Sequence, residues 1–486
     1  MALQMMMGKG ALPGKGLGRQ LQEEVQIPKL IEKKDRFGLG FTPDYKHKRQ
    51  EIEKRQARRK ARLNGREAEW ELMTFPPISK SFKSGGLLIK ESHQVNSVHN
   101  EGLEQGSLEG KNFLYWNGVR AELVISEPEL AKEVLKNNEK AFPKRTATIY
   151  GRKLLGNGIV FIEGEKWAKH RKLANYAFHG ESLKNMTPTI IASVETMMKK
   201  WKGQEGKGIE VFHEFRLLTS EVISRTAFGS NKIWKTADLL ESEKLEKGIH
   251  DCVLEIVKKR ENKFVSGEVD GFGNDFLGLL VNAYHDLNDK SMLSMEDLVD
   301  ECKTFYFAGQ ETVNFLLAWT ILLIAIHGDW QEKARGEVID IFGNQNPYPE
   351  GIAKLKIMTM IINETLRLYS QPSGMMRKVE KEVRLGKLVL PANIDLQIAS
   401  IAFHCSPQLW GDDVHLFKPE RFAKGVAKAT NYNAAAFFPF GLGPRSCVGM
   451  TFATTEAKIA LSMILQRYSF TLSPTYVHSP ISPLTL

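Results

Sequence analysis

The feature that most constrains this chain is a glycine-rich loop that carries a cysteine and leads directly into a helix. Residues 440–449 read FGLGPRSCVG, and residues 451–467 have helical periodicity. The glycines allow tight turns and the close approach of a flat partner to the backbone. Cys447 lies just before the helix, where free N–H groups and the helix dipole stabilise a thiolate. Arg445 can hold a carboxylate with two hydrogen bonds. A lone cysteine is more often a small buried hydrophobe, so the inference depends on the whole string.

A second pattern lies within a long apolar helix expected over residues 295–326. Gly309 is costly inside a helix and makes sense if something lies close to the backbone there. Thr312 can donate its hydroxyl to the carbonyl of Ala308, four residues back, and so bend the helix. With Glu311 beside it, this predicts a groove that presents a hydroxyl and a carboxylate. The alternative for this segment alone is an ordinary core helix with one tolerated glycine.

Two further patterns are weak by themselves. Glu364 and Arg367 are i,i+3 neighbours on one helix, a common surface arrangement, and a further arginine, Arg421, follows in the string PERF. Trp167 and Arg171 lie four residues apart on a helix and present two donors on one face. A tryptophan half-buried under an arginine stem is the plainer interpretation of that pair.

Together and in this order, these strings resemble those of cytochromes P450, and the resemblance covers roughly residues 111–486. It implies a mainly α fold with a minor β part. It implies that Cys447 ligates the iron of heme b (iron protoporphyrin IX) and that Glu311 and Thr312 are catalytic residues that relay protons. The buried structural triad would be Glu364, Arg367 and Arg421. The implied heme contacts are Trp167, Arg171, Ala308, Arg377, Phe440, Gly443, Arg445, Cys447 and Gly449.

The resemblance also implies a reaction. One oxygen atom from O₂ would enter a small lipophilic substrate, and a separate NADPH–cytochrome P450 reductase would supply the electrons. Short phrases at residues 177–183, 330–338 and 390–398 resemble the plant clan that includes secologanin synthase. A P450-like isomerase or dehydratase would need no reductase, and the intact Glu311–Thr312 pair argues against it. Terpenoids, fatty acids and hormone-like diterpenes all stay open as substrates.

Residues 1–110 do not resemble the start of a plant P450. Residues 1–100 hold 20 basic and 11 acidic side chains, whereas the rest of the chain is almost neutral. The glycine cluster at residues 8–18 and the basic run at residues 46–62 resemble the G-patch segment of a plant retroelement polyprotein. This implies contact of residues 1–62 with RNA or an RNA helicase. The alternative is a largely disordered basic segment joined by a linker to a P450 domain over residues 111–486.

Three departures from the family are expected to matter. No membrane-anchor helix is apparent, so the endoplasmic reticulum membrane, where the family lives, and the soluble cytoplasm are both allowed. Residues 226–231 run directly into residues 232–235, where relatives have a segment that roofs the substrate pocket. The last residues stop short of a hairpin that lines the substrate site in relatives. The competing hypothesis is therefore a chimeric, G-patch nucleic-acid-associated protein with a degenerate, inactive P450 body.

Four cysteines in 486 residues make no disulfide framework and indicate a reducing compartment.

Overall fold

The computed structural model describes residues 112–117, 120–136, 141–146, 149–230, 242–286 and 293–478. The chain divides into two compact units, Met1–Gly86 and Leu87–Leu486. The first unit lies wholly outside the described residues. The expected G-patch-like segment and basic run, the junction after residue 231 and the last eight residues also lie outside them.

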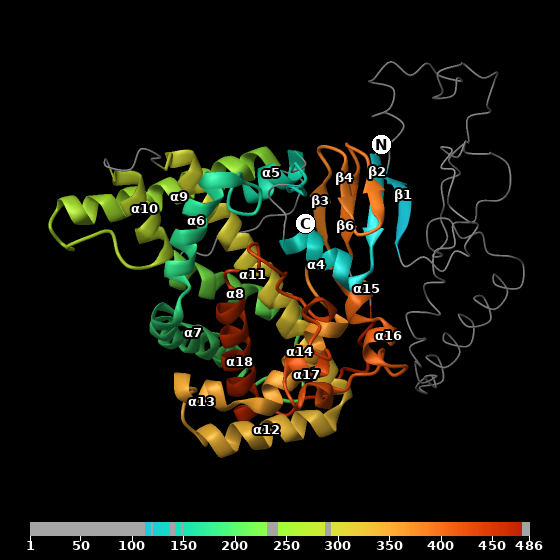
Figure 1. Cartoon of the computed structure of the whole chain (residues 1–486). Helices are drawn as coiled ribbons and strands as arrows, with labels where there is room; N and C mark the ends of the chain where they lie inside the picture. The colour runs from blue at the N-terminus through green and yellow to red at the C-terminus, as the bar shows by residue number, and fades with distance from the viewer. Residues whose placement is uncertain are drawn as a thin grey trace, which may run out of the picture. The chain divides into compact units, whose positions relative to one another are not determined.

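A four-stranded sheet forms most of the β part (Figure 1), and its order is β1-β2-β6-β3. Two short β-rich runs on either side of the pair Asn117-Gly118 predict a hairpin. The structure has it, because β1 and β2 pair antiparallel from Phe113↔Val124 to Asn117↔Arg120. β2 then pairs parallel with β6, and β3 pairs antiparallel with β6. Strands β4 and β5 pair antiparallel in a small hairpin of their own. The strand bounds are β1 Phe113–Asn117, β2 Arg120–Ile125, β3 Met375–Lys378, β4 Val383–Leu385, β5 Leu388–Leu390 and β6 Asp395–Ile398.

Helices make up most of the remaining described residues, as expected. The helices up to the long central one are α4 Pro128–Lys136, α5 Ile149–Leu155, α6 Gly164–Ala177, α7 Gly180–Trp201, α8 Val211–Ala227, α9 Ser242–Val265, α10 Phe276–His285 and α11 Met295–Ile326. The later helices are α12 Gly328–Phe342, α13 Pro349–Lys354, α14 Lys356–Leu368, α15 Ser400–His404, α16 Pro407–Trp410, α17 Val426–Ala429 and α18 Met450–Arg467, with 3₁₀ turns η2 Pro419–Phe422 and η3 Ala434–Ala436.

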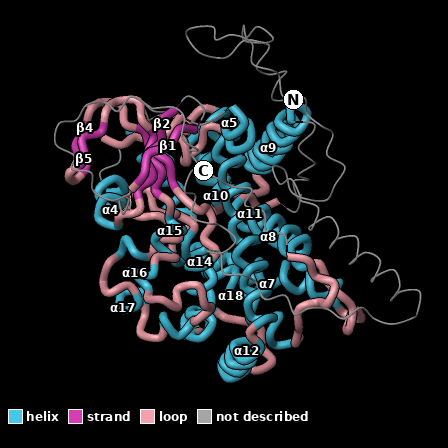
Figure 2. The backbone as a smooth tube through the Cα atoms, turned by 90° about the vertical axis from the view of Figure 1, so that its right-hand side faces the viewer, coloured by secondary structure: helices cyan, strands magenta, loops and turns pink. Residues whose placement is uncertain are grey.

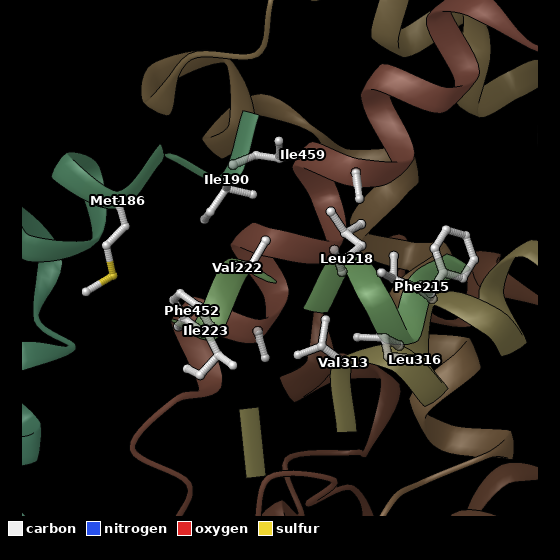
Figure 3. Packing of buried hydrophobic residues seen from close by; sticks show 14 of the residues in the cluster. Met186, Ile190, Phe215, Leu218, Val222, Ile223, Val313, Leu316, Phe452 and Ile459 are labelled. Carbon is white, nitrogen blue, oxygen red and sulfur yellow. The ribbon is translucent and has the colours of Figure 1, made fainter. Parts of the chain in front are cut away.

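The long helix α11 is the centre of the helical core. It begins at a capping box, in which Ser294 and Asp297 bond each other's backbone N–H groups. It has the length and composition to cross a membrane, but 56% of its most apolar window is buried inside the protein, as in a core helix. Figure 3 shows how its apolar face packs against two neighbouring helices. Val313 and Leu316 of α11 belong to one buried cluster with Val222 and Ile223 of α8 and with Phe452 and Ile459 of α18.

The sheet and the helical core have separate hydrophobic clusters. Figure 2 shows the strands gathered on one side of the helices. The smaller cluster joins the sheet to α4 and includes Ile125, Leu135, Leu396 and Phe438. The loop that carries the cysteine links the two, because Phe438 belongs to the smaller cluster while Phe440 packs on the larger one. This arrangement places the loop where the two clusters meet.

Candidate functional site

A cavity of about 1910 Å³ lies between α11, α6, β3 and the cysteine loop. Most of the site residues expected from the sequence line it, although they are separated by up to 282 positions in the chain. Apolar side chains such as Phe178, Ile223 and Phe305 form much of the remaining wall. The expected site residues along the wall are Trp167, Arg171, Ala308, Glu311, Thr312, Arg377, Phe440, Arg445, Cys447 and Gly449.

The cysteine loop folds back on itself through two backbone hydrogen bonds, from the N–H of Cys447 to the carbonyl of Phe440 at 2.7 Å and from the N–H of Ser446 to the carbonyl of Gly443 at 3.1 Å. Gly443, expected to contact heme, does not line the cavity. Its φ of +78° is in the left-handed region, and a Cβ there would lie 2.5 Å from the backbone oxygen of Leu135 in α4. The glycine at this position therefore allows the loop to pack against α4.

Cys447 presents its side chain to the cavity, and protein surrounds it on the other sides. Its exposed surface is therefore cavity surface. This enclosure raises the pKa of the Cys447 thiol, while the backbone N–H of Gly449 and the positive charge of Arg171 oppose the rise. A bound metal ion would reverse the balance, because a coordinating thiol loses its proton. Cys447 is thus placed to bind a metal from one side of the cavity.

Positive charges gather at one end of the cavity, and one of them was not expected from the sequence. Lys144 forms an isolated β-bridge with Arg377, and the neighbouring Arg145 ties this segment to the sheet through Asp395, at 3.1 Å. Burial, followed by the charges of Arg377 and Arg445, lowers the pKa of Lys144 to about 7. Burial also lowers the pKa of Arg377 to about 10. The buried Nε of Arg377 has no hydrogen-bond partner among the described residues. This end of the cavity therefore suits an anionic ligand.

Helix α6 brings Trp167 and Arg171 to the same region. The guanidinium carbon of Arg445 lies 4.2 Å from the centre of the Trp167 ring, a cation–π contact, and Arg445 Nη1 donates to the carbonyl of Ile162 at 2.8 Å. Arg171 Nη1 donates to the carbonyl of Ser446 at 2.5 Å. These contacts join α6 to Arg445 and Ser446, the two residues that precede the cysteine.

The groove expected in α11 has the predicted hydrogen bond, from Thr312 Oγ1 to the carbonyl of Ala308 at 2.6 Å. Glu311 forms an ion pair with Arg216 of α8 at 3.9 Å, a partner that the sequence did not suggest. Burial raises the pKa of Glu311, and Arg216 opposes the rise. A Cβ on Gly309 would lie 2.7 Å from Cδ1 of Ile223. Because Gly309 has no side chain, α8 can pack closely against α11 at this position, and Gly309 also faces the cavity.

The three residues of the expected triad lie together away from the cavity. Arg367 donates to both carboxylate oxygens of Glu364, at 2.8 and 2.7 Å, and both side chains are fully buried. Arg421 Nε lies 3.5 Å from Glu364 Oε1, and Arg421 also donates to the backbone oxygen of Asp413 at 2.6 Å. The backbone N–H of Lys418 donates to the Glu364 carboxylate at 3.0 Å. The carboxylate therefore joins α14 to η2.

The sequence profile of the cytochrome P450 family matches residues 86–244 and 231–484. Cytochrome P450 CYP749A22 of Panax ginseng is 54% identical over 409 residues, which cover 78% of each chain. An 11-oxo-beta-amyrin 30-oxidase of Glycyrrhiza uralensis is 42% identical over 416 residues, covering 78% of this chain and 79% of that protein. A 7-deoxyloganic acid hydroxylase of Catharanthus roseus is 39% identical over 417 residues, covering 78% and 80%. The chain therefore belongs to the cytochrome P450 family and is a P450 monooxygenase.

Proposed function

We propose that the chain is a heme-thiolate monooxygenase that inserts one oxygen atom from O₂ into a small lipophilic substrate. One observation carries this proposal: Cys447 faces a largely apolar cavity with a cluster of cations at one end. The electrons would come from NADPH through a separate NADPH–cytochrome P450 reductase. A heme-thiolate iron supplies the oxygen activation when it is bound.

The residues present fit heme b. Cys447 would ligate the iron. Gly449 and Phe440 would lie against the porphyrin, and Ala308 would leave room for it on the side of α11. The two propionates would neutralise the cations around Arg377. A propionate that accepts a hydrogen bond from the buried Nε of Arg377 would explain why this donor has no partner among the described residues. Trp167, Arg171, Arg445 and Lys144 would complete the propionate end.

The chain's own contribution to the reaction would be proton transfer and orientation. Thr312 would hold a proton at Oγ1, where its bond to Ala308 already fixes the hydroxyl. Glu311, with its pKa raised by burial, keeps a proton to higher pH than an exposed glutamate and so could act as a general acid. The apolar cavity wall would hold the substrate and exclude water. The triad of Glu364, Arg367 and Arg421 would have a structural role.

The substrate is proposed only as a class. The apolar wall suits a lipophilic molecule, and two relatives are named for 11-oxo-beta-amyrin and 7-deoxyloganic acid. We therefore propose a terpenoid-like substrate over a fatty acid. Association with the endoplasmic reticulum membrane, as in plant P450s, would be tested by fractionation, in which recovery in the soluble cytoplasmic fraction would contradict it.

The test is the spectrum of the full chain after expression with ample heme. Wild type should show the shifted Soret band of the reduced carbon-monoxide complex, and Cys447→Ala should lose it. Cys405→Ala, at a half-buried cysteine outside the cavity, is the matched control and should keep it. Survival of the band in Cys447→Ala would refute the ligand assignment. A colourless wild-type chain that binds RNA in a salt-sensitive way would favour the G-patch alternative instead.

A further inference from the structure

Beside the proposed heme site, a row of four polar contacts joins the α5–α6 segment to the first half of α11. We call this row the polar seam. Two contacts are side-chain pairs between helices and two involve the backbone near the end of α5. The four contacts are Lys166–Asp297 at 2.5 Å, Asn157 N–H to Asp300 at 2.8 Å, His170 Nδ1 to Glu301 Oε1 at 2.5 Å, and Thr304 to the carbonyl of Leu155 at 2.6 Å.

The seam continues the stripe of α11 that faces the cavity. Residues 297, 300, 301 and 304 are spaced by three and four positions, and the same spacing leads on to 308, 311 and 312. One face of α11 therefore holds α6 at its N-terminal half and presents the Ala308–Thr312 groove one to two turns later. A shift of α6 along this face would change the distance between the propionate end of the cavity and that groove.

The pair His170–Glu301 is the buried side-chain pair of the seam. These residues are 3% and 1% exposed, whereas the side chain of Lys166 is 49% exposed. Burial raises the pKa of Glu301, while His170 opposes the rise, and Glu301 Oε2 has no hydrogen-bond partner among the described residues. An apolar pair of similar volume would hold two helices together at least as well. A directional contact of 2.5 Å fixes their register, which apolar packing alone leaves looser.

The position of His170 in α6 links the register of α6 on α11 to the placement of the expected heme contacts. His170 immediately precedes Arg171 and lies one turn after Trp167, so fixing His170 against α11 fixes both donors. We propose that His170 and Glu301 are positioning residues for heme: they hold α6 so that Trp167 and Arg171 meet the propionates. This inference rests on the proposed function, since it assumes that heme occupies the cavity.

The experiment measures the rate of heme loss from the loaded full chain to excess apomyoglobin. The key variant is the double substitution His170→Leu with Glu301→Met. It removes both polar groups, so no buried charge is left unpaired and the fold should be retained. We expect its heme loss to be at least about tenfold faster than in wild type, the effect of one lost charge-assisted hydrogen bond. The conservative variant His170→Asn keeps an N–H near the Nδ1 position and should recover much of the slow rate.

The matched control is Tyr306→Phe. Tyr306 also lies in α11 and donates to Ser220 of α8 at 3.1 Å in a buried contact between helices, but this contact does not involve α6. The unfolding temperature of this variant should be lower than that of wild type, while its rate of heme loss stays at the wild-type value. Equal acceleration in the control and the double variant would reduce the pair to a structural role and overturn the inference, as would a wild-type rate in the double variant. A wild-type chain that takes up no heme would instead refute the proposed function.

Discussion

Heme binding should become weaker as the pH rises above neutrality, and Lys144 should be the cause. In the folded chain, burial and the charges of Arg377 and Arg445 lower the pKa of Lys144 from 10.5 to about 7, while Glu163 opposes the change. Two propionates at this end would favour the protonated amine and raise its pKa again. Below pH 7, Lys144 carries its proton with or without heme, so this group adds no pH dependence. Above pH 7, the heme-free chain has lost that proton and must regain it on binding.

The size of the effect follows from the shifted pKa. With a pKa of about 7 before binding and a proton that the propionates hold throughout this range after it, the affinity falls about 50-fold between pH 7 and pH 9. The limiting slope is tenfold per pH unit, or about 1.4 kcal/mol. Arg377, whose pKa is about 10, keeps its charge through most of this range and adds little to the slope.

The assay is a heme titration of the full chain at pH 7, 8 and 9. Lys144→Met should bind heme more weakly at pH 7 but with a much flatter pH dependence. Lys207→Met is the matched control, because Lys207 also lines the cavity but is exposed. Its pH dependence should match that of wild type. A flat wild-type curve, or equal slopes in wild type and Lys144→Met, would refute the reasoning.

Three other substitutions test the remaining parts of the site. Thr312→Ala should keep heme but uncouple NADPH consumption from product formation, and an unchanged ratio of product to NADPH would remove Thr312 from the mechanism. Arg367→Met leaves Glu364 buried without its main partner and should lower the free energy of unfolding by about 3–5 kcal/mol in urea titrations; a loss under 1 kcal/mol would contradict this. Gly309→Ala should cost about 1–3 kcal/mol because its Cβ meets Ile223, and Ile223→Ala should relieve part of that cost in a double-mutant cycle. Strictly additive costs would argue against the close approach.

Features that depend on local spacing were predictable from the sequence. The hairpin around residue 117 and the helix over residues 295–326 follow from turn residues and periodicity, and the structure has both. The hydrogen bond from Thr312 to Ala308 was predictable for the same reason, since residues four positions apart meet on any helix. Local sequence patterns predict these features because only residues close together in the chain are needed to form them.

Features that depend on distant segments could not be predicted in this way. Lys144 meets Arg377 through a bridge between segments 233 positions apart, and His170 meets Glu301 across 131 positions. No periodicity links such residues, because only the packing of the sheet and helices brings them together. Gly443 shows the same limit, since the sequence indicated a need for glycine there but not that the neighbour is the backbone of α4.

The two sides of the cavity differ in how firmly the chain holds them. Directional contacts join the cysteine loop to α6 and α6 to α11: the half-buried hydrogen bond from Arg171 to Ser446 and the buried pair His170–Glu301. The cavity wall also includes residues 204–208 between α7 and α8, which are exposed. The sequence also predicts a missing roof segment on the substrate side. In the proposed function, heme retention depends on the cysteine loop and α6, and substrate binding depends on the rest of the wall. A normal heme spectrum would therefore say little about how well this P450 binds its substrate.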